Sequence, residues 1–243
     1  MDAFDLSTAP QEFASWATTL YACNIYTNFI WLYVYYGMIY RSYMDKSFAM
    51  PLISQCLNIA WEIVFGFLFS QDHWFITLSF QAAVISNCGV IYAAIKYGAR
   101  EWDRSPMIQR NLPWIYIGGT LLAIVGHISL TKELGMVRAC FQGAIVCQAI
   151  LSVGYVCQLL VRGSTRGFSL NLWFFRFTGS LVMVPEFYIR VNYWPDAFSW
   201  LGEPFMLWCC FIYLGFDLAY PVFFWYIQRH EKKEALAKNL KSM

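Results

Sequence analysis

The chain has 243 residues, of which 59% are hydrophobic, 20% aromatic and only 13% charged. Soluble domains carry about 25% charged residues, so this composition excludes an ordinary soluble protein and indicates an integral membrane protein. The net charge is only +2, and the basic residues lie in connecting segments rather than in one patch with interleaved aromatics. A nucleic-acid partner is therefore not expected.

Seven hydrophobic runs follow the acidic N-terminal segment, which lacks the basic start of a cleavable signal peptide. They lie at about residues 20–40, 50–70, 75–97, 112–130, 136–161, 168–189 and 205–227. None shows the period-2 alternation of a membrane β-barrel, and in lipid a helix satisfies its own backbone. The sequence predicts an all-α integral membrane protein, a seven-transmembrane-helix bundle that forms a single domain over residues 1–243. Pro185 is expected to kink the sixth helix.

The distribution of Lys and Arg predicts the orientation of this bundle. Alternate connections place most of the basic residues on one side, so the positive-inside rule puts the N-terminus in the lumen and the C-terminus in the cytosol. The rich side comprises Arg41, Lys46, Lys96, Arg100, Arg104, Arg110, Arg162, Arg166, Arg229, Lys232, Lys233, Lys238 and Lys241, and the poor side Lys132, Arg138 and Arg190.

Two carboxyl groups lie deep within predicted spans, Glu62 in the run 50–70 and Asp217 in the run 205–227. An acidic residue at mid-membrane costs roughly 2.5–3.5 kcal/mol, so a chain that keeps one either pairs it or uses it. Polar and aromatic residues recur on the same helix faces and predict a shared chamber. These stripes are Gln55, Asn58 and Glu62 on the second helix, Tyr213, Asp217, Tyr220 and Phe224 on the seventh, and Asn24, Asn28, Trp31 and Tyr35 on the first.

Other polar residues within the spans have structural explanations. Arg176 can form an ion pair with Glu62 or Asp217, but not with Glu186, which lies ten residues away, about 15 Å of helix rise. We expect His127 and Glu186 near the lumenal ends of their helices, where a headgroup or water can solvate them. The residues typical of interhelical hydrogen bonds are Asn24, Asn28 and Asn87.

Buried acids and abundant aromatics together suit one kind of chemistry. A carboxyl group in a low-dielectric site can stay protonated near neutral pH and act as a general acid. The 11 Trp, 16 Tyr and 21 Phe offer ring faces that attract a carbocation when water is excluded. This combination favours cyclisation of a lipophilic polyene. Aromatic residues also form membrane-interface belts, so composition alone does not select the reaction.

Four stretches carry a resemblance to a known family. They are MDAFDLSTAPQEF, CLNIAWEIVF, NLWFFRFTGSLVMVPEFY and YLGFDLAYPVFFWY. In the order and spacing of these stretches the chain resembles the fungal membrane-bound, seven-helix terpene cyclases of meroterpenoid and indole-diterpene biosynthesis, across essentially all seven runs. Members often carry a Tyr-Pro pair after the first acid motif, where this chain has Phe69 and Ser70. That departure leaves the shape of this helix end, and the substrate subtype, open.

The resemblance implies a metal-independent, acid-initiated terpene cyclase of the isomerase or intramolecular lyase type, with Glu62 and Asp217 as the catalytic pair. It implies a lipophilic farnesyl- or geranylgeranyl-bearing polyketide or indole substrate that is protonated at a terminal epoxide, although some members protonate an olefin. The implied setting is fungal secondary metabolism in the endoplasmic reticulum membrane. Membrane lipid and other enzymes of the pathway are the expected partners.

One of the two acids would donate the proton, while the other orients the donor or helps remove the terminal proton; the sequence does not assign the two roles. Trp61, Tyr213 and Tyr220 are candidates for cation stabilisation or donor positioning. Asn58 and Arg176 are candidates for support of the acids. No metal or other cofactor is expected, because no diphosphate leaves and the sequence has no DDxxD motif.

The alternative function is a small-solute or proton transporter that uses the same midplane acids as binding or relay sites. A receptor ranks third, because the loops contain no recognisable signalling motif. A transporter would move solute across sealed vesicles without changing its mass or ring count, which distinguishes it from a cyclase.

Overall fold

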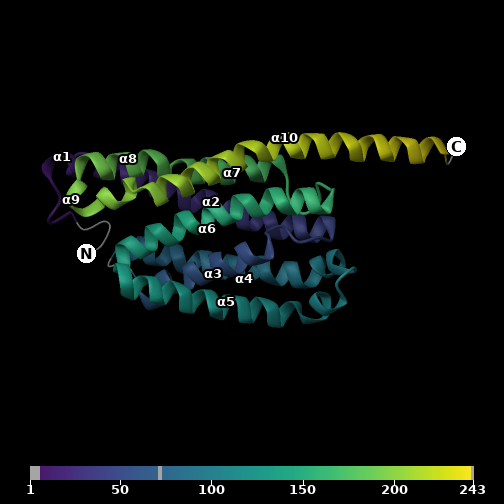
Figure 1. Ribbon diagram of the computed structural model, residues 1–243, viewed down its shortest axis with the longest axis horizontal. Coiled ribbons are helices and arrows are strands. Elements are labelled where there is room, and N and C mark those ends of the chain that lie inside the picture. The colour runs from purple at the N-terminus through teal and green to yellow at the C-terminus, as the bar shows by residue number, and fades with distance from the viewer. Residues whose placement is uncertain (1–5, 71–72, 242–243) are drawn as a thin grey trace.

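The computed structural model describes residues 6–70 and 73–241, and this part of the chain contains helices and no strands. The long helices run side by side along one axis (Figure 1). The prediction of an all-α protein is therefore confirmed over these residues. In chain order the helices are α1 Gln11–Ala14, α2 Ala17–Asp45, α3 Leu52–Ile63, the π-helix η1 Val64–Leu68, α4 Trp74–Gly98, the 3-10 helix η2 Ala99–Trp102, α5 Pro106–Leu134, α6 Met136–Arg162, α7 Leu170–Leu181, α8 Met183–Tyr193, α9 Pro195–Phe198, the 3-10 helix η3 Ser199–Gly202 and α10 Pro204–Lys241.

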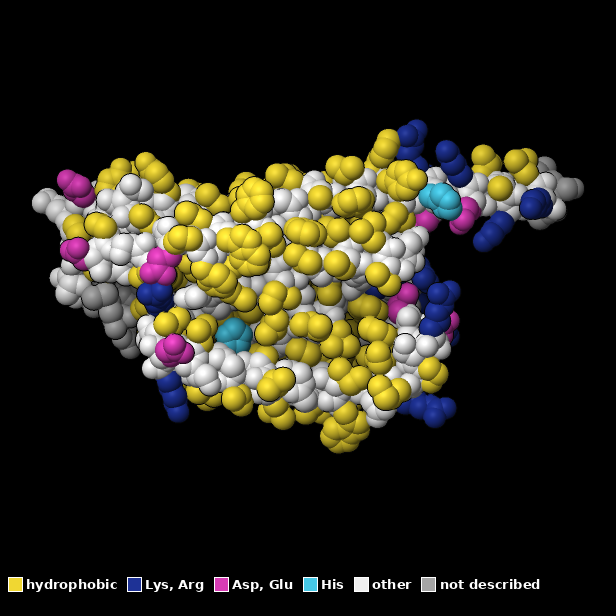
Figure 2. All heavy atoms as spheres, in the orientation of Figure 1, with side chains coloured by type: hydrophobic (Ala, Val, Ile, Leu, Met, Phe, Trp, Pro, Cys, Tyr) yellow, Lys and Arg dark blue, Asp and Glu magenta, His cyan; other side chains and the backbone are white. Residues whose placement is uncertain are grey.

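Several of these helices are suited to a lipid environment. Within the described ranges, four are long and apolar enough to cross a membrane: α4 together with η2, α5, α6 and α10. Hydrophobic side chains cover the middle of the molecule between its charged ends (Figure 2). Among them, Trp114 and Phe211 are 72% and 74% exposed, which suits contact with lipid rather than water. The chain is a membrane protein, whereas the count of seven spans stays a prediction.

Two predicted runs differ from the helices that form. The sixth run divides into α7 and α8 at Val182. Pro185 explains the break, because it has no amide hydrogen to donate and its ring crowds the carbonyl of Leu181, where α7 ends. The seventh run continues as α10 to Lys241, because its polar tail is rich in strong helix formers such as Ala, Leu, Glu and Lys. This tail projects beyond the body of the molecule (Figure 1).

Helix α6 occupies the centre of the bundle, where it packs against α3, α5 and α10. α2 packs against α4 and α7, and α3 also packs against α4 and α5. The close approach of α3 and α6 requires Gly154, because a Cβ atom there would lie 3.0 Å from the Ser54 hydroxyl and 3.1 Å from the Pro51 ring. This arrangement brings α2, α3, α4 and α6 around a common interior.

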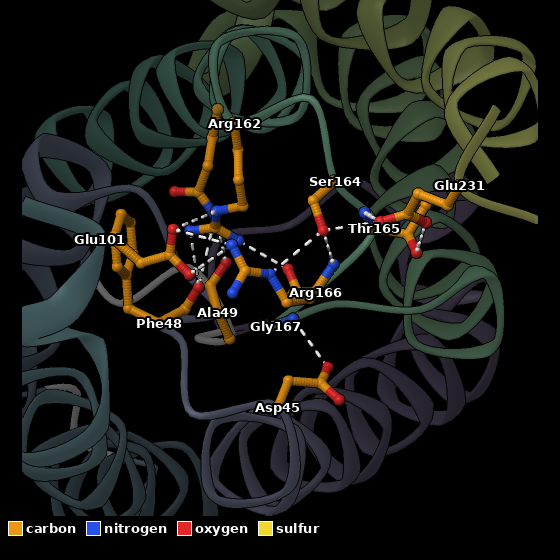
Figure 3. A network of polar contacts seen from close by, with 11 residues as sticks. Asp45, Phe48, Ala49, Glu101, Arg162, Ser164, Thr165, Arg166, Gly167 and Glu231 are labelled. Atoms are coloured by element: carbon orange, nitrogen blue, oxygen red, sulfur yellow. Dashed lines mark hydrogen bonds and ion pairs between the residues drawn. The ribbon is translucent and has the colours of Figure 1, made fainter. Parts of the chain in front are cut away.

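A network of charged and polar groups ties the loops together at the end from which α10 projects (Figure 3). The Arg162 guanidinium donates to the Phe48 carbonyl (3.1 Å) and the Arg166 carbonyl (2.6 Å), and it lies 3.6 Å from Glu101. Glu231 of α10 accepts hydrogen bonds from the adjoining loop. We call these groups, together with Ser164, Thr165, Gly167 and Asp45, the Arg162 network.

Candidate functional site

A cavity of about 190 Å³ lies between α2, α3, α4, α6, α7 and α8. Two carboxyl groups, Glu62 and Glu186, line it. The aromatic part of its wall comprises Trp31, Tyr35, Trp61, Phe80 and Phe141. The side-chain amides in the wall are Asn24, Asn28, Asn58 and Gln148. The whole stripe predicted on the first helix and two members of the second, Asn58 and Glu62, therefore share a chamber, whereas Gln55 and the stripe of the seventh helix lie outside its lining.

Glu62 lies in the wall with only 2% of its surface exposed, and neutral groups hold its carboxyl. The Tyr35 hydroxyl donates to Oε1, and the Asn58 amide donates to the same oxygen at 3.0 Å. The Asn87 amide donates to Oε2 at 2.9 Å. No Lys, Arg or His among residues 6–70 and 73–241 forms an ion pair with Glu62.

Hydrogen bonds behind Glu62 fix its partners in turn. Asn58 also donates to the Tyr35 hydroxyl at 2.6 Å, and the Gln55 amide donates to Asn87 Oδ1. Tyr35 comes from α2, Gln55 and Asn58 from α3, and Asn87 from α4, so three helices converge on one carboxyl. Such a network holds the carboxyl in one orientation toward the cavity.

The helix that carries Glu62 changes its winding immediately after this residue. α3 ends at Ile63 and continues as η1, in which the Phe69 amide donates to the Val64 carbonyl at 2.8 Å. The Gln81 side chain satisfies the Gly66 carbonyl of this turn at 3.2 Å. Single π-turns of this kind occur often at functional sites, where they re-aim neighbouring side chains.

Asp217 has a different environment. Its side chain and that of Arg176 are 1% and 0% exposed, and they form an ion pair. Ser152 donates to the other carboxylate oxygen at 3.1 Å, and Gln148 approaches the same oxygen at 3.5 Å. Of the two pairings that the sequence left open for Arg176, the structure forms the one with Asp217 and not the one with Glu62.

The Asp217–Arg176 pair lies behind the cavity wall, since neither residue is among those that line it. Gln148 connects the two layers, because it lines the cavity and also contacts Asp217. Tyr213 and Tyr220 are likewise outside the lining and are buried in the core beside Asp217. Of the predicted site residues, Glu62, Asn58 and Trp61 therefore line the cavity. The others lie behind its wall: Asp217, Arg176, Tyr213 and Tyr220.

Trp61 is fixed in the wall beside Glu62. Its indole N–H donates to the Cys140 carbonyl at 2.9 Å, and its ring meets Phe80 edge-on with the centroids 4.8 Å apart. Gly143 of α6 leaves room for the indole, because a Cβ atom there would lie 3.0 Å from Trp61 Cδ1. One aromatic surface of the cavity therefore has a defined position.

The expectation that His127 and Glu186 are solvated is wrong. They are only 8% and 7% exposed, because neighbouring helices cover both side chains. The Cys147 sulfur lies 3.9 Å from His127 Nε2, and Glu186 lines the cavity. Asn24 donates to Glu186 at 3.5 Å, the one hydrogen bond that its carboxyl makes within the described chain.

The predicted asparagine contacts have mixed outcomes. Asn87 joins α4 to Glu62 of α3, as expected for an interhelical bond. Asn28 instead donates to the Asn24 carbonyl of its own helix at 2.9 Å, and Asn24 donates both to the Leu20 carbonyl at 3.0 Å and across to Glu186. Short amide side chains reach the preceding helical turn easily, so their presence in a span does not identify the partner.

Several residues of the site carry only weak signals in the sequence, and periodicity did not identify them. It placed Tyr35 on a polar face but gave it no role, and it did not single out Gln148 or Ser152. The last two stand four residues apart in an otherwise apolar run, a spacing that puts both on one face of α6. No group of three or more His, Cys, Asp or Glu side chains in the described part of the chain could hold a metal ion.

Comparisons with known proteins agree in pointing to one family. Residues 4–230 match the family described as Pyr4-like transmembrane terpene cyclases. The terpene cyclase janB of Penicillium janthinellum is 41% identical over 244 residues, which cover 100% of both chains. The terpene cyclase atmB of Aspergillus flavus is 41% identical over 235 residues, 96% of each chain, and paxB of Penicillium paxilli is 38% identical over 232 residues, also 96% of each. No solved structure matches the chain significantly.

Proposed function

Because the chain belongs to the family of Pyr4-like transmembrane terpene cyclases, we propose that it cyclises a prenylated substrate after Glu62 protonates a terminal epoxide. Membership of this family makes the protein a terpene cyclase that acts on a lipophilic terpenoid, and it gives no support to the transporter alternative. The epoxide step rests above all on the Glu62 carboxyl, which is held by neutral groups in the wall of an aromatic cavity.

The contrast between the two predicted acids supports Glu62 as the proton donor. A carboxyl that pairs with a buried guanidinium is a carboxylate and has no proton to give, which describes Asp217. Glu62 has a phenol and two amides as partners: Oε1 accepts from Tyr35 and Asn58, whereas Oε2 accepts only from Asn87 and keeps a further position for a proton. A protonated Glu62 can therefore keep these contacts while it offers its O–H to an epoxide oxygen.

Asp217 is assigned a positioning role instead. It compensates the charge of Arg176, and together with Ser152 it holds Gln148, whose amide reaches the cavity. Tyr213 and Tyr220, one turn before and after Asp217, pack the helix that carries it.

Aromatic rings of the cavity are suited to stabilise the cations that follow. The opened epoxide leaves a tertiary carbocation, which successive alkenes attack to close rings. Each well-placed ring face contributes about 0.5–2 kcal/mol to a nearby cation when water is excluded. Trp61 is the leading candidate because it lies next to Glu62 and its indole is fixed by Cys140.

The size of the cavity indicates that it encloses only part of the substrate. At about 190 Å³ it is smaller than the roughly 300–1,000 Å³ of sites that enclose drug-sized ligands. We therefore assign the cavity to the reacting end of a farnesyl or geranylgeranyl chain. The aromatic group, a polyketide or an indole, would extend toward the surrounding lipid, where other pathway enzymes can deliver it.

For the membrane arrangement we propose one domain over residues 1–243 with seven spans, formed by α2, α3 with η1, α4, α5, α6, α7 with α8, and α10. α2 has 29 residues, about 43 Å of helix, so it is long enough to span although its cavity-facing polar residues lower its hydropathy. α1 and the C-terminal end of α10 lie at opposite ends of the molecule, and Lys and Arg gather mainly at the α10 end (Figures 1 and 2). These features support a lumenal N-terminus and a cytosolic C-terminus. The endoplasmic reticulum as the membrane is part of the same proposal.

The test is product analysis of membranes that contain the protein, incubated with a panel of farnesyl and geranylgeranyl aromatic or indole compounds, each as the terminal epoxide and as the unepoxidised alkene. We expect new isomers of unchanged mass from the wild type and none from the double variant Glu62→Gln with Asp217→Asn. Glu203→Gln is the matched control, because Glu203 is an exposed acid paired with Arg138 outside the cavity. Full activity of the double variant would refute the assignment of the acids, and cyclisation of only the unepoxidised compounds would refute the epoxide step alone.

A further inference from the structure

Glu186 is the second carboxyl group that lines the cavity, and neither the protonation step nor the packing of the helices accounts for it. It comes from the first turns of α8, just beyond the break at Val182, and it is 7% exposed. Its carboxyl receives only the long 3.5 Å hydrogen bond from Asn24 within the described residues. We infer that Glu186 is the base that removes the terminal proton and so ends the cyclisation, an assignment that rests on the function proposed above.

The position of Glu186 fits the end of a reaction that starts at Glu62. Both acids contact α2, Glu62 through Tyr35 and Glu186 through Asn24. These two α2 residues are eleven positions apart, which corresponds to about 16 Å along the helix. Glu62 and Glu186 therefore face the cavity at different levels along α2, so Glu186 does not lie beside the first cation formed at Glu62. It meets the positive charge only after ring closure has moved that charge along the cavity.

One basic side chain of the same helix lies near Glu186. Arg190 lies one helical turn farther along α8, is fully buried, and interacts electrostatically with Glu186. Its guanidinium lies 5.0 Å from the centroid of the Phe141 ring and 4.9 Å from that of Phe198, so aromatic packing fixes it near the cavity. Arg190 thus adds positive potential on the side of the cavity where Glu186 lies, without forming an ion pair with it within the described residues.

Other groups in this part of the wall are not bases. Asn24, Asn28 and Ser180 have neutral side chains that do not accept a proton near neutral pH. His127 is not among the residues that line the cavity. Asp217 also lies outside the lining and is held by Arg176. Glu186 is therefore the group best placed to accept a proton from a late cation.

The bonds and charges balance over the whole reaction. Glu62 gives its proton to the epoxide oxygen, the carbon–oxygen bond breaks to leave a hydroxyl and a tertiary cation, and alkene electron pairs form the ring bonds. The Glu186 carboxylate then takes a proton from the carbon next to the final cation, and that C–H electron pair becomes the new alkene. The product is an isomer of the substrate, and proton exchange with solvent afterwards returns Glu62 to its acid form and Glu186 to its carboxylate.

The experiment measures both substrate consumption and product distribution for Glu186→Gln, Glu186→Asp and the control Glu203→Gln, with the epoxide panel described above. For Glu186→Gln we expect consumption to change less than about tenfold, because Glu62 is intact. The ratio of the wild-type alkene to misplaced alkenes and water-trapped alcohols should fall about 100-fold, the lower end of the effect of a positioned base. Glu186→Asp keeps a carboxylate and should restore part of that ratio, whereas Glu203→Gln should leave it unchanged.

A merely structural role would lower the rate or the thermal stability without redirecting the products. An unchanged product ratio in Glu186→Gln would overturn the inference, as would complete loss of consumption in a variant that unfolds at the wild-type temperature. If Glu186→Gln does not fold, Glu186→Asp tests the inference in its place. Its carboxylate is shorter by one methylene, so the ratio of the wild-type alkene to the other products must still change. If the wild type cyclises no panel compound, both the proposed function and this inference fail. If the wild type is active and the product ratio of Glu186→Gln is unchanged, only this inference fails.

Discussion

The cavity and the Arg162 network are two polar regions of an otherwise apolar protein, and their acidic side chains differ in the partners that they have. In the Arg162 network, Glu101 lies 3.6 Å from Arg162 and 3.4 Å from Arg166, and Glu231 accepts three hydrogen bonds from Ser164 and Thr165. In the cavity, neither Glu62 nor Glu186 takes part in any of the ion pairs seen in the described chain.

This difference separates groups that hold the fold from groups that are free to react. Charges with several fixed partners connect loops that would otherwise move independently, so their removal affects stability first. Glu62, whose partners are all neutral, can change its protonation state without leaving an unpaired counter-charge. Asp217 is intermediate, because it is fully paired but contacts the cavity wall through Gln148.

Of the substitutions considered, Glu62→Gln in the cavity should lower activity the most. Loss of a positioned general acid is expected to lower kcat/KM by about 10²–10⁴. The glutamine has the same shape and retains an oxygen for Tyr35 and Asn58, but its amide nitrogen cannot accept from Asn87, so the unfolding temperature should fall modestly. Initial rates and thermal unfolding in detergent check both parts, with Glu203→Gln as the control. A variant that unfolds early and loses activity only in proportion would place Glu62 with the structural acids.

Much of the fold follows from the sequence, because the positions of the helices depend on local hydrophobicity. The predicted run 136–161 became α6 almost residue for residue, and the run 75–97 became α4. The extension of α10 to Lys241 was missed, because a polar tail of strong helix formers carries no hydrophobic signal. The break at Val182 was predictable from Pro185, although the residue at which the helix stops was not.

The site could be predicted only in part, because helical periodicity gives the face of one helix and not its partners on others. It identified Glu62 and its stripe, but the contacts of Glu62 with Tyr35 and Asn87 depend on how three helices meet. It left Arg176 with two equivalent acids, and only tertiary packing selects Asp217. Glu186 was misplaced for the same reason, since a carboxyl near a helix end is solvated or enclosed depending on its neighbours.

Asp217→Asn tests the intermediate case and should act mainly on stability. It leaves the buried Arg176 guanidinium without its counter-charge, which is expected to cost about 3–5 kcal/mol in the free energy of unfolding. Activity should fall as well, because Gln148 loses its fixed partner. Chemical denaturation in detergent, together with product analysis, measures both effects.

The double variant Asp217→Asn with Arg176→Met sharpens this result, because it removes both charges. It should regain a large part of the lost stability, as buried ion pairs replaced by apolar groups often do. If Asp217 donated the proton itself, stability would return while activity stayed at the level of Glu62→Gln. Partial return of activity with stability is the result expected for a positioning group.

Arg162→Ala tests the Arg162 network and should lower stability without lowering the turnover of the folded protein. The side chain is only 6% exposed, and it loses two hydrogen bonds to carbonyls and the ion pair with Glu101. Each hydrogen bond that involves a charged group contributes about 1.5–3 kcal/mol, so the free energy of unfolding should fall by at least that amount. Turnover by the folded fraction should equal that of the wild type. Arg166→Ala is the control, because its side chain is 54% exposed and such pairs contribute about 0–1 kcal/mol.

Two truncations of the C-terminal end of α10 should have the smallest effect on stability, confined to the loop that Glu231 contacts. Residues 232–241 of α10 are exposed, whereas Glu231 accepts hydrogen bonds from Ser164 (2.7 Å) and Thr165 (2.7 Å). A chain that ends after residue 234 should therefore match the full chain in activity and unfolding temperature. A chain that ends after residue 229 loses the Glu231 contacts and should be destabilised by about 0.5–1.5 kcal/mol, with faster amide exchange in the loop at Ser164. Equal stability of the two truncated chains would show that Glu231 does not anchor the loop, and a loss of activity in the longer one would mean that the exposed tail takes part in the function of the cavity.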